Sequence, residues 1–324
     1  MPGPSSAVSD MTPKSRDGRV LAVYYSQSGQ MRRILERLLA PLVAAGVEVV
    51  WAPLEPVPAY PFPWRVREFF DAFPETVAGI PCVLRAPAFD PDGQYDLIVL
   101  GWQPWFLSPS IPAASFLRSE ARRVLAGRPV VTVVGARNMW LMAQEEVKRL
   151  VHAAGGALVG NIALVDRAPN LVSAVTILRW MLRGKKEPFL GFPEAGVGAA
   201  DVDAASRFGP VLLSHLRSSS FAGAQGSLLA LDAVQVSPPL MAIERRGIFI
   251  FRLWSRFILG RKRAPAGWAR RVKVALFSVY LPLVLFLVSP LVFLLAALGA
   301  RLHPARTERE VRYHSGVDLR PPDA

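Results

Sequence analysis

The chain has 324 residues, a formal net charge of +13 and a hydrophobic content of 52%, with a mean hydropathy of +0.29. This apolar excess is high for a purely soluble protein, so we expect a membrane segment. A single cysteine, Cys82, and four widely spaced histidines exclude an intramolecular disulfide and do not predict a metal centre. The basic charge suits nucleic acid, anionic lipid or phosphorylated ligands, and its position beside an apolar run favours lipid over nucleic acid.

The first elements predict a βαβ unit. Residues 1–18 are rich in proline and serine and lack the apolar core of a signal peptide, so we expect a disordered leader and a cytoplasmic folded part. Val20–Tyr25 is a continuous apolar run, typical of a buried parallel strand. A helix is expected over residues 30–45, ending at Gly46, and a second strand over Val47–Trp51. Such short connections imply a right-handed crossover and a parallel sheet.

Residues 52–93 interrupt this regularity with prolines that stop any long helix or central strand. Aromatic residues are interleaved with them: Tyr60, Phe62, Trp64, Phe69, Phe70 and Phe73. Two interpretations stay open. The segment is either an insertion that packs on the domain or the wall of an apolar substrate pocket.

The alternation of strands and helices then resumes. The apolar runs predict three more strands with two helices between them: Tyr95–Gly101, 113–125, Pro129–Val134, 141–154 and Ala157–Leu164. Five strands separated by helices predict an α/β fold with a doubly wound, five-stranded parallel sheet, which we assign to residues 19–183.

The C-terminal region is expected to be a helical extension over residues 184–270. It contains an amphipathic helix over Asp201–Leu216, with Asp201 as its N-cap. An aromatic and apolar stretch, Ile248–Leu259, carries two arginines four residues apart and suits an interfacial helix.

Val274–Ala300 contains no charged residue and forms the centre of an expected transmembrane or membrane-anchoring segment, 271–302. Because Pro282 and Pro290 interrupt the run, a kinked single span is the first expectation; a hairpin re-entering one leaflet and a buried core helix are the alternatives. Basic residues are densest upstream, which places the catalytic domain on the cytoplasmic face of the membrane. A polar tail, 303–324, is expected to follow.

Ligands of doubly wound sheets bind at the carboxyl ends of the strands, where three loops are expected to meet. The first loop offers hydroxyls and N–H groups at a helix N-terminus, which suit a phosphate. The second offers two indoles that can stack on a planar ring, and the third a glycine turn with a guanidinium group. The candidate cofactor-binding residues are Ser26, Gln27, Ser28, Gly29, Gln30, Trp102, Gln103, Pro104, Trp105, Gly135, Ala136, Arg137, Asn138 and Trp140.

Two further groups have open roles. Asp166 and Arg167, just past the fifth strand, either face the site or form a helix cap and a salt bridge. Cys82 has no nearby histidine in the sequence, so it is either a small buried hydrophobe or an unassisted nucleophile. No general base can be named, because no His/Glu pairing is visible.

The first loop carries a resemblance. Ser26-x-Ser28-Gly29 after a strand resembles the FMN-phosphate loop of the flavodoxin-like superfamily, whose pattern continues to a threonine where this chain has Met31. The resemblance implies a flavodoxin-like fold and FMN as the cofactor. Homodimers are common among such proteins, so a homodimer is a candidate assembly.

A second resemblance covers residues 20–260 and is to bacterial proteins of the dialkylresorcinol condensing enzyme family. It is carried by Tyr25–Gln30, Pro61–Trp64, Gly101–Pro112, Gly135–Trp140, Gly160–Arg167, Asn170–Ser173 and Ile243–Gly247. The resemblance implies a role in making dialkylresorcinol lipids or pigments of the aryl-polyene or flexirubin type. A lipid-like small molecule would be the substrate, and a ketosynthase is a candidate partner.

Three functions therefore remain open. One is an FMN-dependent oxidoreductase that converts a dialkyl-cyclohexanedione to the resorcinol. Another is carbon–carbon condensation, which would need Cys82 as its nucleophile. The third is a flavin-free membrane scaffold for a biosynthetic complex, which the methionine at position 31 favours.

Overall fold

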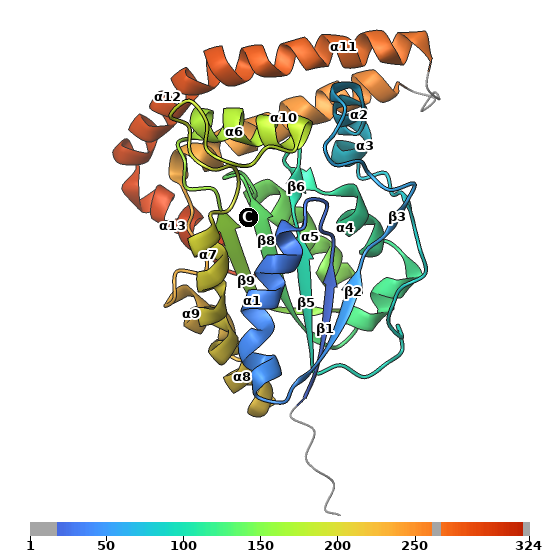
Figure 1. Ribbon diagram of the computed structural model, residues 1–324. Helices are drawn as coiled ribbons and strands as arrows, with labels where there is room; N and C mark the ends of the chain where they lie inside the picture. Colours follow the sequence, from blue (N-terminus) through green and yellow to red (C-terminus); the bar gives the residue numbers. More distant parts are fainter. Residues whose placement is uncertain (1–17, 261–266, 320–324) are drawn as a thin grey trace, which may run out of the picture.

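Five parallel strands form the centre of the computed structural model, which describes residues 18–260 and 267–319 (Figure 1). The strands are β1 (Arg19–Tyr24), β2 (Glu48–Pro53), β5 (Leu97–Trp102), β8 (Pro129–Ala136) and β9 (Ala157–Val165). Their spatial order is β2-β1-β5-β8-β9, and every neighbouring pair is parallel. Ranked along the chain this order is 2-1-3-4-5, the flavodoxin-like order, so the predicted doubly wound sheet is confirmed. The expected leader lies outside the described residues, apart from Gly18.

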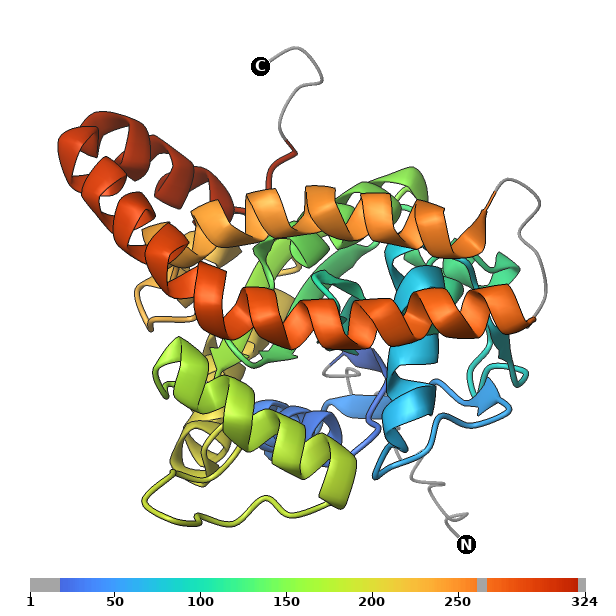
Figure 2. The same cartoon turned by 90° about the horizontal axis from the view of Figure 1, so that it is seen from above.

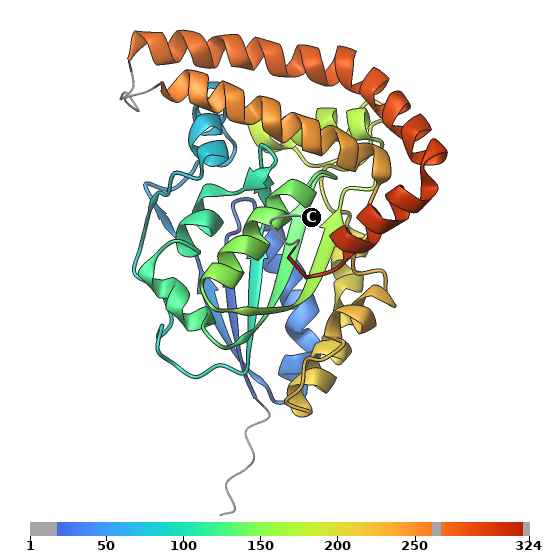
Figure 3. The same ribbon diagram turned by 180° about the vertical axis from the view of Figure 1, so that it is seen from behind.

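Helices cover both faces of the sheet. One face carries α1 (Gln30–Ala44), α7 (Ala199–Asp203), α8 (Gly209–Arg217) and α9 (Ala224–Leu229), and the other carries α4 (Ile111–Phe116) and α5 (Leu141–Ala153) (Figures 1 and 3). The central strands are therefore buried on both sides, which explains why their sequences are continuously apolar. α7 to α9, which come from the expected helical extension, complete this layer.

Two predicted helices are shorter than expected. The stretch Asp201–Leu216 is divided into α7, a 3₁₀ turn and α8. Pro210 has no N–H to continue a helix, and a Cβ on Gly209 would lie 2.6 Å from Pro41 Cγ on α1. The N-cap of α7 is Gly198, so the Asp201 assignment was wrong. Similarly, the helix expected over 113–125 is α4 followed by a 3₁₀ turn, Glu120–Leu125.

The insertion 52–93 forms a small antiparallel two-stranded sheet, β3 (Pro56–Val57) with β4 (Val83–Leu84), and two short helices between these strands, α2 (Val66–Asp71) and α3 (Phe73–Ala78). A hairpin, β6 (Pro104–Trp105) with β7 (Ser108–Pro109), follows β5 directly. Its tip residues Phe106 and Leu107 have φ values of 48° and 60°. Left-handed backbone at two non-glycine residues is strained, so surrounding contacts must hold this tip in place.

A layer of helices lies across the carboxyl end of the sheet (Figures 1 and 2). It consists of α6 (Asn170–Arg183), α10 (Pro238–Leu259), α11 (Trp268–Leu283), a π-helical turn η3 (Val284–Val288) and α12 (Ser289–Leu302). The interfacial helix expected over Ile248–Leu259 is thus the second half of a longer helix. The apolar segment is one continuous helix, bent at a π turn near its two prolines, and not a hairpin.

Within the described residues, Trp268–Leu302 is the one helix whose length and apolarity would suffice to cross a membrane. Its mean hydropathy is 2.7 in the most apolar window, of which only 6% is buried by the rest of the protein. The segment expected as a polar tail forms α13 (Pro304–Ser315), which returns to the folded unit and contacts α5.

Candidate cofactor site

The loops that follow β1, β5 and β8 line one pocket at the carboxyl edge of the sheet. It lies beside β1 and β5, where the strand order reverses and where flavodoxin-like folds bind ligands. The cavity has a volume of about 200 Å³, and about 150 Å³ suffices to hold one benzene ring. Nine of the predicted residues line it: Gln27, Ser28, Gln30, Gln103, Pro104, Trp105, Gly135, Ala136 and Arg137.

The loop before α1 leaves the N-terminus of that helix open to an anion. Gly29 is the N-cap of α1 and has a φ of 81°, a left-handed conformation that glycine adopts at no steric cost. The N-cap residue offers no capping side chain, and α1 has no acidic residue in its first turn, so no negative charge neutralises its positive end. Ser26 Oγ accepts the first-turn N–H of Arg32 at 3.2 Å and does not line the pocket, whereas Ser28 does.

The two glutamines of this loop already have partners. Gln27 Nε2 donates to the Pro61 carbonyl at 2.7 Å, and Gln30 Nε2 donates to the Val197 carbonyl at 2.9 Å. These bonds tie the loop to the insertion and to the segment before α7. The glutamines therefore position the loop, and the groups left for a phosphate are the Ser28 hydroxyl and backbone N–H groups.

Met31 fills the space under the pocket. It is 2% exposed, and a Cβ on Gly101 or Gly135 would lie 3.0 Å from its Sδ or Cε atom, respectively. The methionine and the two glycines thus form an interlocked contact between α1, β5 and β8. Packing explains why a methionine stands where the flavodoxin-like pattern has a threonine.

Of the two tryptophans expected to stack on a cofactor, only Trp105 lines the pocket. It is held edge to face by Tyr25, Tyr60 and Trp64, with ring centroids 5.8, 5.1 and 5.5 Å away. Trp102 is the last residue of β5 and is fully buried in the core. Successive side chains of a strand point to opposite faces of the sheet. At its position in β5, the Trp102 ring packs into the core and does not reach the pocket.

Aromatic residues outside the three loops complete the walls: Phe62, Trp64 and Phe69 from the insertion and Trp180 from α6. The insertion therefore packs on the domain and also lines the cavity. Trp64 is 4% exposed, and its Nε1–H has no acceptor among the described residues. A buried donor without a partner is costly, and an oxygen of a bound ligand would satisfy it. Trp180 was missed because its apolar helix carries no motif.

Arg137 is the one cation of the predicted set that lines the cavity. Its Nη1 donates to both the carbonyl and the side-chain oxygen of Asn170 at 2.8 Å. Burial lowers the pKa of Arg137 to about 10, against the attraction of Asp166 and Glu244, so the guanidinium keeps its charge at neutral pH. It can therefore balance negative charge on a ligand in the pocket.

Asn138 and Trp140 lie away from the pocket and line a separate cavity beneath α10. The buried Glu244 of α10 accepts hydrogen bonds from the N–H groups of Trp140 and Met142, both at 3.0 Å, and so caps α5 across more than one hundred residues. Burial raises the pKa of Glu244 to about 8, against the effect of these bonds and of Arg137. No local sequence signal marked this long-range cap.

Asp166 and Arg167 take the structural role. The Asp166 carboxylate accepts the N–H groups of Ala168 and Gly196 at 2.8 and 3.3 Å. Arg167 forms a salt bridge with Asp201 at 2.6 Å.

Cys82 lies outside the pocket and lines another cavity, beside Ser115. Its Sγ lies 3.4 Å from Ser115 Oγ, and it neighbours the hydroxyl of Tyr60, whose pKa is raised by burial and by this thiol. None of these contacts supplies a cation or an imidazole to activate a thiolate. This surrounding does not match that of a condensing nucleophile.

The residues present fit FMN in chemistry. A helix N-terminus without a neutralising acidic side chain, preceded by a glycine and a serine, suits the phosphate, and aromatic walls with one cation suit the ring system. Within the described residues, no group of three or more His, Cys, Asp or Glu side chains could hold a metal ion.

No protein-family model matches the sequence, and no curated protein matches it. Among solved structures, a flavoprotein from Lactobacillus acidophilus NCFM in complex with FMN is 15% identical, with a TM-score of 0.38, over 45% of this chain and 93% of that chain. A two-electron reduced flavodoxin from Megasphaera elsdenii is 19% identical, with a TM-score of 0.27, over 47% and 89%. The Trp repressor binding protein from Bacillus subtilis is 9% identical, with a TM-score of 0.28, over 51% and 98%. The fold assignment rests on the strand order and directions of this chain.

Proposed function

We propose that the chain is an FMN-binding oxidoreductase whose pocket accepts part of a lipid-like substrate next to the cofactor. The observation that carries the proposal is the meeting of the β1, β5 and β8 loops around one aromatic pocket, with the open N-terminus of α1 beside it. Ser28 and the N–H groups of the loop before α1 would hold the phosphate. Trp105, Trp64 and Trp180 would enclose the ring system, and Arg137 would balance its charge.

Bound FMN would supply a two-electron acceptor. A dialkyl-cyclohexane-1,3-dione could then lose a hydride and a proton and become the aromatic resorcinol. The acidity of a 1,3-dione means that only a modest base is needed to form the enolate, whose negative charge Arg137 would stabilise. The unpaired N–H of Trp64 is a donor for an oxygen of the ligand. The long apolar helix nearby is consistent with a substrate that dissolves in lipid.

The cofactor is tested by a single charge change in the phosphate loop. In Ser28→Asp, a carboxylate would stand just before α1, where it repels a phosphate but interacts favourably with the helix dipole. We therefore expect the variant to remain folded and to lose FMN. The matched control is Ser214→Asp, at an exposed position of α8, which lies at the other end of the sheet; this variant should keep FMN (Figure 1).

The readout is the flavin released on denaturation of detergent-purified protein, with circular dichroism to check the fold. Equal flavin content in the two variants would place the phosphate elsewhere. Wild-type protein that neither carries nor binds FMN would contradict the proposal and favour the scaffold function.

A further inference from the structure

The helix Trp268–Leu302 has an exposed apolar stripe along its whole length. From Trp268 to Leu283 its large exposed side chains recur every three or four residues, which keeps them on one face; beyond this, consecutive residues of the π turn are exposed as well. They are Trp268, Val272, Leu276, Val279, Leu283, Phe286, Leu287, Val288, Leu291, Leu294, Leu295, Leu298 and Leu302. α10 adds Phe249, Leu253 and Phe257 at a spacing of four. We call these two sets of side chains the platform.

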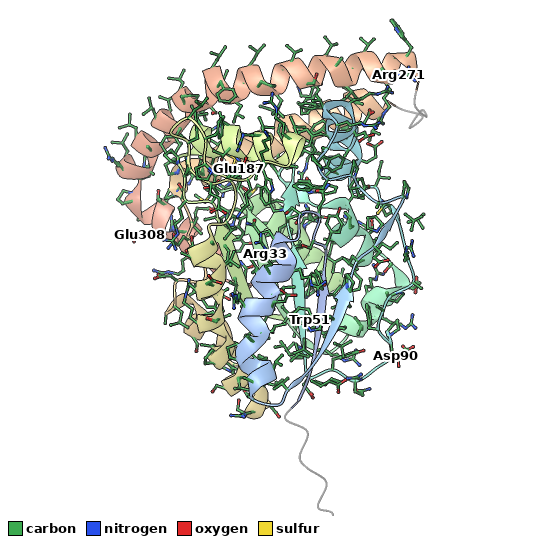
Figure 4. All side chains as sticks on the ribbon, viewed as in Figure 1. Arg33, Trp51, Asp90, Glu187, Arg271 and Glu308 are labelled. Carbon is green, nitrogen blue, oxygen red and sulfur yellow. The ribbon has the colours of Figure 1, made fainter. Side chains whose placement is uncertain are left out.

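The platform faces away from the folded unit. In Figure 4 the side chains of α11 stand out along one edge of the molecule, with no other described element beyond them; the labelled Arg271 marks the N-terminal end of α11. Contiguous apolar patches of this extent are rare on soluble monomers, so the platform requires a cover.

The upstream end of the apolar helix is fixed to the folded unit. Phe277 is fully buried, and its ring stacks on that of Phe73 with a centroid distance of 3.7 Å. Arg270 donates to both carboxylate oxygens of Glu75, at 2.7 and 2.9 Å. These contacts hold α11 flat across α2 and α3.

The downstream end is fixed to the same unit. On α13, the buried His314 lies 3.4 Å from a carboxylate oxygen of Glu145 on α5, and Tyr313 donates to the other oxygen. Lys148 of α5, which is 1% exposed, lies 3.0 Å from Glu145 and donates to the carbonyl of Asp318. A buried polar cluster of this kind is costly to break.

These two attachments constrain how the helix can meet a bilayer. A transmembrane helix must place its ends on opposite sides of a hydrocarbon core of about 30 Å. Here both ends are docked on one folded unit, so the helix can cross only if one attachment breaks. A helix lying in the plane of one leaflet keeps both attachments and still buries the stripe.

The charge around the platform points to anionic lipid. Between residues 238 and 303 the sequence has eleven arginines and lysines but one acidic residue, Glu244, which is buried. Arg252 and Arg256 are exposed between the apolar residues of α10. Apolar side chains interleaved with basic ones are typical of helices that lie in the headgroup region of anionic membranes.

We propose that the platform lies in one leaflet of an anionic membrane, and that the chain does not cross the bilayer. The pocket adjoins this surface, because Phe69 and Phe106 line the cavity and also pack against the cluster that holds α11. A substrate dissolved in the leaflet would thus reach the site without passing through bulk water. This route for the substrate rests on the proposed function, whereas the position of the platform in the leaflet does not.

Accessibility of two introduced cysteines tests the topology. The full chain with Cys82→Ser carries either Arg306→Cys, after the apolar helix, or Ser214→Cys, on the folded unit; both positions are exposed. Inverted and right-side-out membrane vesicles from the expressing cells are treated with an impermeant maleimide. We expect both cysteines to react in inverted vesicles only. Reaction of Arg306→Cys in right-side-out vesicles alone would establish a spanning helix and overturn the proposal.

Flotation with lipid vesicles tests whether the platform binds an anionic membrane. We expect binding to rise when phosphatidylglycerol is added to phosphatidylcholine and to weaken with salt. Val279→Asp on the platform should weaken binding by about tenfold or more. The matched control is Val83→Asp in the small β3–β4 sheet, since Val279 and Val83 are 63% and 69% exposed. Equal binding by both variants, or a soluble dimer that does not float, would overturn the proposal. These assays need no flavin, so their outcome is independent of the cofactor test.

Discussion

Removal of the Phe277 ring should free α11 from the folded unit. In the wild type this side chain is fully buried and contacts the rings of Phe73, Phe70 and Phe251, with centroids 3.7, 6.2 and 5.8 Å away. Phe→Ala substitutions at such sites cost about 3–5 kcal/mol. The cluster around Phe277 has only five buried residues, so this loss is a large part of what holds the helix.

Hydrogen exchange of the full chain in detergent measures this loss locally. Since about 1.4 kcal/mol corresponds to tenfold, Phe277→Ala should accelerate exchange in α11 by about a hundredfold or more, provided that exchange follows local opening. Peptides from α5 should be unaffected. Val279→Ala, at a position 63% exposed, is the matched control and should change the opening free energy by less than about 0.5 kcal/mol. Unchanged exchange in α11 of Phe277→Ala would show that the aromatic cluster does not dock the helix.

Three further substitutions have defined outcomes. The raised pKa of Glu244, about 8, means that the folded state holds a proton that the unfolded state releases near pH 4.5, so stability should fall between about pH 5 and 8. Glu244→Gln should flatten this fall in urea unfolding; an unchanged slope would contradict the assignment. For Glu145, burial raises the pKa, but the neighbouring His314 side chain and the Lys148 charge outweigh it and lower the pKa to about 2. The docking of α13 should therefore weaken as pH falls from about 4.5 to 2, and a Glu145→Gln variant whose α13 exchange keeps the wild-type pH dependence would refute this. Cys82→Ser should leave flavin content and turnover unchanged, and loss of product with flavin retained would favour condensation.

The sheet was predictable because buried parallel strands leave a direct trace in the sequence. Val20–Val23 and Leu97–Leu100 are apolar at every position, and in the structure all eight residues are 0% exposed. The ends of two helices were also visible in the sequence, because Gly46 and Gly155 follow α1 and α5 and adopt the left-handed conformation that is common after a helix. The single helix predicted over Asp201–Leu216 was wrong because Gly209–Pro210 is a helix breaker, and this breaker is visible in the sequence.

The sequence predicted the location of the site, because loops that follow parallel strands meet at the carboxyl edge of the sheet, but it did not predict every side chain that lines the pocket. The order of the strands brings Ser28, Trp105 and Arg137 together, whatever the details of each loop. The sequence did not show which side chains of these loops point into the pocket. Trp102 was expected there, but it lies in the core. The cap from Glu244 and the wall from Trp180 depend on contacts across long sequence distances, which a single sequence does not encode locally.

The prediction of the apolar segment shows the same limit. Composition identified the apolar helix, but the attachments at its two ends depend on Phe73 and Glu145, which are distant in the sequence. Only their positions in space separate a helix that lies flat from one that crosses.

Flavin analysis of the full chain, purified in mild detergent without added cofactor, tests the central claim most directly. The account predicts a yellow protein that releases FMN on denaturation at about one molecule per chain, and no FMN from Ser28→Asp. A colourless protein that does not take up added FMN would contradict it.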